Sequence, residues 1–499
     1  MGSTAEWLFP DLLEVIFSNL ELKDLVACSG VNRAWNEAAN SVKLWRKFVT
    51  KSDLSWLPTN MNCELHSSSS STPTDSNTSL NQSPSPTLPA SNPYKQIIQQ
   101  RNQLKYNWSH GCITEFNLVP TRYGLKPVDR EIGPNVEYTS SAPQDCIYYP
   151  VLGELENGEV VLKLFSFKSE VKLVCTLAVD FALDSVSIVC VMRDFIVWLL
   201  EDGKVQYIAL STCDKCSFKD CKVQTLTPSL IINNTEDQYF LTMDTNYIVA
   251  STCESLYVWN KKSLQLTLSR IPPMLGIEDG GFLGSYDANP IFLDDGYLIL
   301  CYSDHLEHTI LIEEYNLKTN NKLSTKLTIE GVVEMVHCSG DFIVMITTVE
   351  EEGEEEEFHK IFIQMRRKND LNQLIYSYYC GDNRCMYKYV FVGNSFLFYN
   401  LETGDYEEID ISTGFRSSMR QVGTNCELLG NLFDNLALIS LDENEYTEVW
   451  DWKKNRRCVK LHSLRLGDCT FINAITAKWV MIQTCYSDSE AYFTVYRCK

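Results

Sequence analysis

The sequence of 499 residues is poor in basic side chains: 43 Lys and Arg stand against 65 Asp and Glu, a formal net charge of −22. Proteins bind a nucleic-acid backbone or anionic lipid through basic surfaces, so we expect neither partner. Long apolar runs are also lacking. The longest, residues 186–200, is interrupted by Arg193 and Asp194 and is too short to span a bilayer. We therefore expect a protein that does not enter a membrane.

Cysteine is present but lacks the spacing of a disulfide framework. The 19 Cys are an odd number and are scattered along the chain. Residues 1–6 do not form the basic and apolar regions of a secretory signal. Both observations favour a reducing compartment, the cytoplasm or the nucleus, in which most cysteines serve as small buried apolar residues.

The sequence also lacks the motifs of common enzyme sites. Phosphate-binding glycine loops, HExxH zinc motifs, EF-hand loops and nucleophile elbows are all absent. Some Cys and His residues lie close in sequence, but without a second pair at ligand spacing; they are Cys213, Cys216, Cys221, Cys380, Cys385, His305 and His308. We predict no metal, no cofactor and no catalytic residues.

Residues 5–50 have the pattern of a small all-α domain. Leu13, Ile16, Phe17 and Leu20 are spaced i, i+3, i+4, i+7, which predicts one apolar stripe on a helix whose first turn contains Pro10. Further helices are predicted near residues 23–30, 33–39 and 44–48. About 45 residues make a marginal core. Such a unit either packs on a neighbouring segment or lends its apolar side chains to a partner.

A linker is predicted over residues 51–110. Within it, 22 of the 28 residues from 66 to 93 are Ser, Thr, Pro or Asn, too few apolar groups to offset the entropy of ordering. We expect a disordered loop there. Residues 94–106 return to a helical pattern with three basic residues and no acid, which predicts a connecting helix.

Residues 111–499 carry an internal repeat of short strands. An apolar strand, usually led by an aromatic residue, recurs at steps of about 40–50 residues. The eight copies are residues 148–151, 195–198, 247–250, 297–300, 342–345, 389–392, 436–439 and 479–482. This predicts an all-β propeller, with eight blades favoured and seven possible because the sixth copy has little room. Residues 113–118 are expected to complete the last blade.

Two motifs resemble known families. Residues 8–20, Leu-Phe-Pro-Asp-Leu-Leu-Glu-Val-Ile-Phe-Ser-Asn-Leu, with their continuation to Phe48, resemble the F-box, with Phe9 and Asn32 departing from the usual pattern. Residues 449–451, Val-Trp-Asp, and residues 258–260, Val-Trp-Asn, are similar to the signature of WD repeats, although no Gly-His dipeptide occurs. The whole resembles an F-box/WD-repeat protein.

The resemblance implies a non-catalytic substrate receptor of an SCF-type ubiquitin ligase. The F-box would dock on a Skp-family adaptor, and through it on a cullin and a RING subunit, while the propeller captures the substrate protein. A cullin-independent scaffold is the alternative. The residues expected to contact the adaptor are apolar: Leu8, Pro10, Leu13, Ile16, Phe17, Leu20, Leu25, Val31, Trp35 and Trp45. Some of them are expected to form an internal core instead.

The net negative charge lies entirely in the predicted propeller. Residues 111–499 hold 34 of the 43 bases and 56 of the 65 acids, a net charge of −22, so the rest of the chain is neutral overall. Substrates are therefore expected to be basic rather than acidic. A candidate contact is the acidic loop Glu350, Glu351, Glu352, Glu354, Glu355, Glu356 and Glu357, which alternatively forms a solvated hairpin tip. The resemblance also implies that an arginine cluster could read a phosphorylated substrate, although the negative charge makes this the less natural fit; the candidates are Arg193, Arg270, Arg384, Arg416, Arg420, Arg456, Arg457 and Arg465.

Overall fold

The computed structural model describes three stretches of the chain, residues 10–49, 92–126 and 148–498. The last stretch has gaps at 168–169, 182–185, 193–194, 211–221, 232–239, 253–254, 271–290, 295, 305–308, 329–331, 340–341, 352–357, 369, 383–388, 393–394, 401–404, 412, 420–425, 434–435, 442–445, 455, 464–468, 476–478 and 487–488. The chain divides into two compact units, Met1–Asn107 with Pro143–Asp145 and Trp108–Ala142 with Cys146–Lys499. Each unit is described by itself.

The first unit is helical. Its helices are α1 Pro10–Phe17, α2 Leu22–Cys28, α3 Arg33–Ala39, α4 Val42–Arg46 and most of α7 Pro93–Ser109. Pro10 begins α1, where its missing N–H is not needed. The Asn32 side chain caps α3 by accepting the backbone N–H of Trp35 at 2.9 Å. The predicted stripe runs past the end of α1, so Leu20 packs on the core from the turn that follows.

The core of this unit gathers side chains from α1 to α4 and from the start of α7. Tyr94, Ile97 and Ile98 of α7 are buried in the same cluster as Leu13 and Trp45. The first unit is therefore supported by a chain segment about 50 residues further on, which gives the marginal helices additional apolar area to bury.

Polar contacts anchor the first turn of α7 to the corner between α3 and α4. Asn92 donates a side-chain N–H to the carbonyl of Asn40 at 2.7 Å, and Lys95 Nζ donates to Asn40 Oδ1 at 2.7 Å. Asn92 Oδ1 also accepts the backbone N–H groups of Tyr94 and Lys95. The predicted boundary of the disordered loop at residue 93 is therefore two residues too far along the chain, because Asn92 caps α7 and Pro93 is the first residue of that helix. Residues 66–91 lie outside the described residues.

In the residues that the structure describes, the second unit contains eight small antiparallel sheets. The first three sheets in chain order are β2 Tyr148–Glu154, β3 Val160–Ser166 and β4 Lys172–Ala178; β5 Val186–Val191, β6 Phe195–Leu200, β7 Val205–Ala209 and β8 Gln224–Thr225; and β9 Phe240–Met243, β10 Tyr247–Ser251, β11 Leu256–Asn260 and β12 Leu266–Arg270. The next three are β13 Ile291–Asp294, β14 Tyr297–Asp304, β15 Thr309–Asn316 and β16 Asn321–Thr328; β17 Val332–Ser339, β18 Phe342–Glu351, β19 Phe358–Arg367 and β20 Asp370–Asp382; and β21 Tyr389–Val392, β22 Ser395–Asn400, β23 Asp405–Asp410 and β24 Arg416–Met419. The last two are β25 Cys426–Phe433, β26 Leu436–Leu441, β27 Tyr446–Asp451 and β28 Arg456–Ser463; and β29 Cys469–Ile475, β30 Trp479–Tyr486 and β31 Ser489–Cys498, to which β1 Ile113–Leu118 is added. Two short 3-10 helices, Pro120–Tyr123 and Trp452–Lys454, lie between strands.

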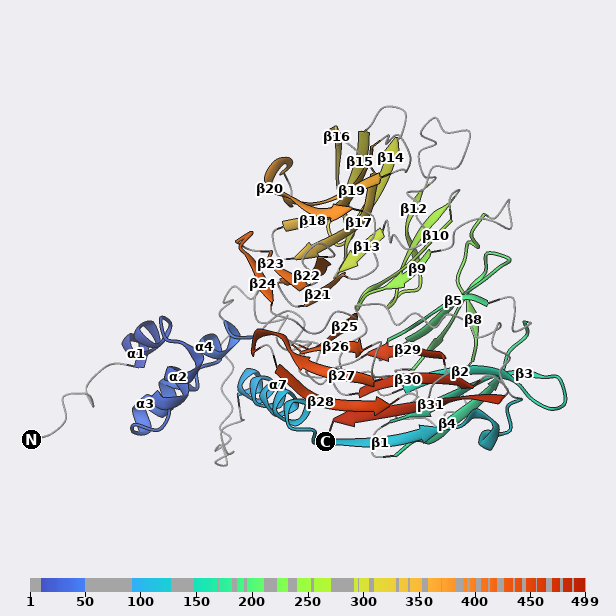
Figure 1. Ribbon diagram of the computed structural model, residues 1–499, viewed down its shortest axis with the longest axis horizontal. Helices are drawn as coiled ribbons and strands as arrows, with labels where there is room; N and C mark the ends of the chain where they lie inside the picture. The colour runs from blue at the N-terminus through green and yellow to red at the C-terminus, as the bar shows by residue number, and fades with distance from the viewer. Residues whose placement is uncertain are drawn as a thin grey trace, which may run out of the picture. The chain divides into compact units, whose positions relative to one another are not determined.

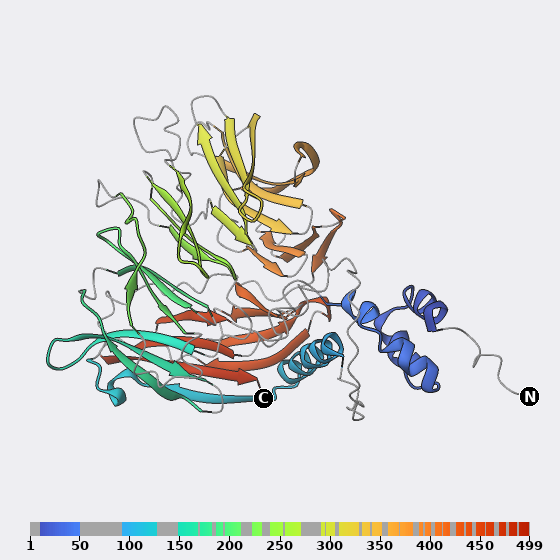
Figure 2. The same cartoon turned by 180° about the vertical axis from the view of Figure 1, so that it is seen from behind.

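The sheets follow one another in chain order around the unit (Figure 1), and the view from behind shows the same succession (Figure 2). Apolar clusters fill the space between neighbouring sheets, as between β6 and β10 or between β14 and β18. The first strands of neighbouring sheets touch, β5 with β9 and β13 with β17. This is the arrangement of a β-propeller, with the first strands innermost and the fourth strands outermost.

The ring is closed by strands from the two ends of the propeller sequence. β1 pairs antiparallel with β31 in an unbroken register from Ile113 opposite Cys498 to Leu118 opposite Phe493. Leu118 is fully buried in a cluster that also holds Tyr149 and Phe165 of the next sheet. The closing strand predicted from residues 113–118 is confirmed.

The repeated apolar segment marks the second strand of six sheets and the first strand of two, β2 and β21. The second strands are covered on both faces by neighbouring sheets, and β6 and β10 are buried along their whole length. A strand buried on both faces reads as a continuous apolar run, which explains the repeat. The sixth copy has room for four strands, β21 to β24, whereas the sheet of the first copy has three in the described residues.

Candidate protein-interaction surfaces

Helix α1 is apolar on two opposite sides. Leu13 and Phe17 are 1% exposed and lie in the core of the first unit, where Phe17 packs edge-on against Trp35 at 5.3 Å between ring centroids. Leu12, Val15 and Ile16 point away from that core and are 46%, 62% and 45% exposed. A helix with apolar side chains all around is typical of one that is covered on both sides.

Other helices of the same unit add to this exposed apolar surface. Val26 of α2, Val31 before α3 and Val42 of α4 are each about half exposed. We define the F-box apolar surface as Leu12, Val15, Ile16, Val26, Val31 and Val42. Four of these residues, at positions 12, 15, 26 and 42, were missed by the sequence reasoning. The signal for two of them was present, since Leu12, Val15 and Ile16 are spaced i, i+3, i+4. Ile16 was predicted to lie on the buried stripe with Leu13, Phe17 and Leu20, and that prediction was wrong, because Ile16 is exposed.

The ten predicted adaptor contacts fall into different environments. Leu13, Phe17, Leu25 and Trp45 are buried core residues, and Leu20 and Trp35 pack partly buried against them. Ile16 and Val31 are exposed. Pro10 starts α1, and Leu8 lies before the first described residue. Trp45 is fixed inside the unit because its indole N–H donates to the carbonyl of Ala39 at 2.6 Å. Core residues of this kind hold in place the helices that carry the F-box apolar surface.

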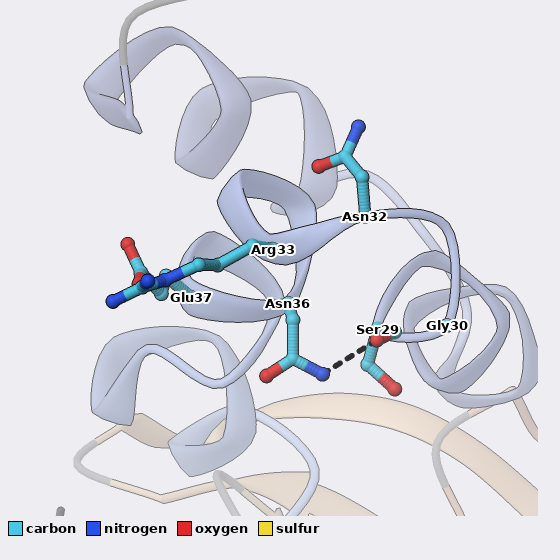
Figure 3. A pocket seen from close by; sticks show the side chains of 6 residues that line it. All are labelled: Ser29, Gly30, Asn32, Arg33, Asn36 and Glu37. Carbon is cyan, nitrogen blue, oxygen red and sulfur yellow. Dashed lines mark hydrogen bonds and ion pairs between the residues drawn. The ribbon is translucent and has the colours of Figure 1, made fainter. Parts of the chain in front are cut away.

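A shallow surface hollow of about 430 Å³ lies where α2 meets α3, between Ser29, Gly30, Asn32, Arg33, Asn36 and Glu37 (Figure 3). Asn36 crosses it and donates its side-chain N–H to the carbonyl of Ser29 at 2.5 Å. Arg33 and Glu37 form an exposed ion pair of 3.0 Å along one side. The hydrogen bond from Asn36 joins α3 to the end of α2 and so helps to fix the relative placement of Val26 and Val31. The ion pair lies within α3, and exposed pairs of this type add little stability.

In the propeller, three third strands carry a buried glutamate at an equivalent position. Glu313 of β15, Glu407 of β23 and Glu448 of β27 are each 2% exposed and lie two residues before Tyr315, Ile409 and Trp450. Each glutamate binds a cation on an outer strand. Lys322 lies 2.8 Å from Glu313, Arg457 lies 3.2 Å from Glu448, and Arg416 pairs with Glu407.

Three of the arginines that are candidates for binding phosphate, Arg270, Arg416 and Arg457, are held in such ion pairs. Arg270 pairs with Glu313 of the neighbouring sheet, and Arg416 also lies over the ring of Tyr378 at 4.4 Å. Arg270, Arg416 and Arg457 stand on the outer strands β12, β24 and β28, each paired with its own glutamate. Arg456, also on β28, stands opposite Asp451 in the register. They do not form one cluster. Arg193, Arg384, Arg420 and Arg465 lie outside the described residues.

The acidic segment 350–357 joins β18 to β19. Glu350 and Glu351 are the last residues of β18 and stand opposite His359 and Phe358. Glu352, Glu354, Glu355, Glu356 and Glu357 lie outside the described residues. The segment therefore connects the two strands of a hairpin in the sheet β17 to β20.

The Cys and His residues weighed as metal ligands lie outside the described residues, except Cys380 in β20. Among the residues that the structure does describe, no group of three or more His, Cys, Asp or Glu side chains is close enough to hold a metal ion. Burial raises the pKa of the Cys301 thiol to about 12 and that of Cys175 to about 11. Both remain protonated and unreactive at neutral pH. No helix in the described ranges is both long and apolar enough to cross a bilayer.

Comparison with known proteins gives a match at the N-terminal helices. Residues 10–51 match the family model described as F-box-like. A search of curated proteins finds no match to this chain.

Solved structures give distant likenesses to the second unit. Sqt1 from Saccharomyces cerevisiae is 10% identical with a TM-score of 0.45, covering 75% of this chain and 99% of its own. The computationally designed protein Ika8 is 13% identical with a TM-score of 0.43, covering 74% and 98%. Hsv2 from Kluyveromyces lactis is 8% identical with a TM-score of 0.37, covering 63% and 95%. These likenesses are too distant to carry an argument, and the propeller assignment rests on the eight sheets of this chain. The chain thus contains an F-box-like domain at residues 10–51, followed by a β-propeller-like region.

Proposed function

We propose that this protein is the substrate receptor of an SCF-type ubiquitin ligase, acting in the cytoplasm or the nucleus. The F-box apolar surface docks on a Skp-family adaptor and through it on a cullin and a RING subunit, and a propeller of eight blades captures the substrate. The observation that carries the proposal is the outward apolar side of α1, at Leu12, Val15 and Ile16, within a segment that matches the F-box-like model. Apolar side chains exposed in this number need a partner to cover them.

Such a receptor contributes position rather than chemistry. It holds a substrate lysine near a ubiquitin-conjugating enzyme and so raises the effective concentration of the two reactants. Three buried glutamates of the propeller support this view, because Glu313, Glu407 and Glu448 are already bound by Lys322, Arg416 and Arg457 in pairs that stabilise the sheets. The propeller then offers surface for protein binding.

Pull-down of a purified Skp-family adaptor tests the docking surface. The double variant Val15→Asp, Ile16→Asp places two charges where the adaptor would contact apolar groups, and we expect it to weaken adaptor binding at least tenfold. The matched control is Leu266→Asp, an equally exposed leucine on the outer strand β12, which should bind normally. Adaptor binding that survives the double variant rejects the proposal.

The same experiment separates the two classes of function. Addition of a cullin to the adaptor complex should give a ternary assembly if the protein is a ligase receptor. A complex that binds the adaptor but excludes cullin favours the alternative, an F-box scaffold that works without a cullin.

A further inference from the structure

Positive charge in the helical unit is concentrated on α4 and α7. In the described part of that unit, residues 10–49 and 92–107, eight Lys and Arg stand against five Asp and Glu, although the whole chain carries a net charge of −22. The acids lie in α1, α2 and α3 or immediately before them, whereas α4 and α7 contain bases and no acid. The helical unit is therefore basic within an acidic protein.

Helix α4 turns its bases away from the core. Leu44 and Trp45 are buried, and the side chains that flank them in sequence are exposed. Residues three or four apart lie next to one another on a helix, so the flanking side chains share one outward side. We define the α4 basic surface as Val42, Lys43, Arg46 and Lys47.

Two of these bases have no counter-charge. Lys23 of α2 and Arg33 of α3 each lie 3.0 Å from a glutamate on or beside the same helix. By contrast, the side chains of Lys43 and Arg46 make no hydrogen bond, ion pair or ring contact in the part of the chain that the structure describes. Substituting these two residues therefore removes charge from the surface without removing a contact within the protein.

The α4 basic surface is continuous with the F-box apolar surface. Val42 belongs to both. Lys47 Nζ donates to the carbonyls of Ser18 and Leu20 at 2.7 and 2.9 Å, and both residues closely follow α1, whose last turn carries Ile16. A partner that covers Ile16 and Val42 therefore has the bases of α4 at the rim of its contact, where polar groups are usual in protein interfaces.

The unpaired bases indicate the charge of that partner. Opposite charges across an interface speed the encounter and fix its orientation, and like charges exclude wrong partners. The propeller sequence, residues 111–499, has a net charge of −22 and repels an acidic partner, whereas the bases of α4 attract one. An acidic adaptor would thus be directed to the helical unit, while a basic adaptor would be drawn to the propeller instead.

We propose that the α4 basic surface binds acidic side chains of the Skp-family adaptor at one edge of the apolar contact. This inference rests on the proposed receptor function and adds to it the chemistry of the partner. The bases of α4 set how fast and in which orientation the adaptor arrives. The apolar side chains of α1 hold the adaptor once it is bound.

Association kinetics of the full-length protein with a purified Skp-family adaptor test the proposal. At low salt, the double variant Lys43→Glu, Arg46→Glu should lower the association rate constant about tenfold and change the dissociation rate constant by less than about twofold. Raising the salt to about 1 M should reduce the difference, because ions screen exposed charges. Equal association rate constants for wild type and double variant overturn the proposal, and so does a difference that salt leaves unchanged.

A matched control separates local charge from net charge. The variant Lys262→Glu, Lys453→Glu changes the net charge by the same amount at two exposed lysines of the propeller, and it should slow association by less than about twofold. A control that slows association as much as the α4 variant does overturns the proposal.

A second variant keeps the test valid if the glutamate substitutions disturb folding. Lys43→Ala, Arg46→Ala introduces no new charge and should slow association about threefold at low salt. An alanine variant that associates as fast as the wild type contradicts the proposal. A wild-type dimer in light scattering at low salt that dissociates in either α4 variant would assign the surface to the acidic propeller of a second copy and also overturn it.

The wild-type protein distinguishes failure of this inference from failure of the proposed function. A wild type that binds no adaptor rejects the receptor role and this inference with it. Adaptor binding that is weakened by Val15→Asp, Ile16→Asp but is as fast in the α4 variants as in the wild type rejects this inference alone.

Discussion

Asp244 joins two neighbouring sheets of the propeller through one carboxylate. Its Oδ1 accepts the backbone N–H groups of Asn246 and Tyr247 at 2.7 Å, and its Oδ2 accepts the N–H of Gly296, just before β14, at 2.6 Å. Gly296 has a φ of +80°, and a Cβ there would come within 2.9 Å of the Tyr247 ring. Only glycine brings its N–H this close to Asp244.

Asp244→Asn is expected to lower the free energy of unfolding by about 1–3 kcal/mol, because an amide cannot accept from both sides and leaves the buried Gly296 N–H without its acceptor. A thermal melt measures the effect. The control Asp202→Asn alters a half-exposed pair with Lys204 and should change stability by less than about 0.5 kcal/mol. An unchanged melting temperature for Asp244→Asn would show that the sheets are held together by apolar packing alone.

Glu313 makes stability depend on acidity. Burial by itself would raise the pKa of Glu313, but hydrogen bonds from Lys322, Arg270 and Tyr315 outweigh it and lower that pKa below its usual value. A carboxylate with a lowered pKa in the folded state adds stability above the unfolded pKa, about 4.3. That contribution is lost as the pH falls through the lower folded pKa.

Glu313→Gln should therefore reduce the melting temperature at neutral pH, by an amount equivalent to about 1–3 kcal/mol because both cations are partly exposed. The gap to the wild type should narrow as the pH falls below about 4. Melts over a pH series measure it, with Asp202→Asn, in a half-exposed pair with Lys204 of the same propeller, as a control that shows little difference from the wild type at any pH. A gap independent of pH would mean that the lost contacts, and not the charge, account for the difference.

At the scale of elements, α1 separates residues that hold the F-box-like domain together from residues that face outward. Leu13→Ala removes a fully buried side chain and should cost about 2–5 kcal/mol. Val15→Ala, two residues further along α1 and on its exposed side, should cost less than about 0.5 kcal/mol. Hydrogen exchange of the α1 amides is the appropriate measurement, because the propeller dominates a melt of the whole chain. Equal exchange in both variants would contradict the assignment of the two sides.

Local patterns in the sequence were sufficient for several elements. Helix α3 has the predicted bounds, since Asn32 is a strong cap and Arg33–Ala39 has no helix breaker. The repeat of apolar strands was sufficient to predict a propeller, because the second strands of its sheets are buried on both faces and so are apolar along their whole length. The second apolar side of α1, at Leu12, Val15 and Ile16, is also periodic in the sequence, but it was not predicted because one stripe already accounted for the helix and Ile16 was assigned to it.

Long-range contacts were beyond the reach of the sequence. Arg270 on one sheet pairs with Glu313 on the neighbouring sheet, and only the folded structure brings the two residues together. From the sequence alone, the arginines were therefore candidates for binding phosphate. The length of β20 was hidden for a similar reason: its exposed apolar residues resemble those of a buried strand, and only the sheet order shows that it is an edge. The repeat likewise marked first strands in two sheets, because β2 and β21 are as apolar as the second strands elsewhere.

At the scale of the whole propeller, stability depends on closing the ring. A ring of sheets is closed only if its last sheet packs against its first. Here β1 is the outermost strand of the last sheet and pairs with β31. Leu118 of β1 packs in the same apolar cluster as Tyr149 of the first sheet. β1 precedes all other strands in sequence, so closure joins the two ends of the unit. Loss of β1 would leave β31 as a new edge of ten residues.

A chain that starts at Trp108 should therefore fold into a cooperative propeller, whereas one that starts at Val119 should melt at lower temperature and aggregate. The expected loss exceeds the roughly 2–5 kcal/mol of the single substitution Leu118→Ala, because the β31 backbone loses its hydrogen-bonded partner as well as apolar cover. Thermal melts combined with light scattering over a range of protein concentrations compare the three proteins. The order of stability should be the Trp108 start, then Leu118→Ala in that same chain, then the Val119 start. If the Trp108 and Val119 chains melt alike and stay monomeric, closure by β1 is dispensable, and the other sheets hold the ring by face-to-face packing alone.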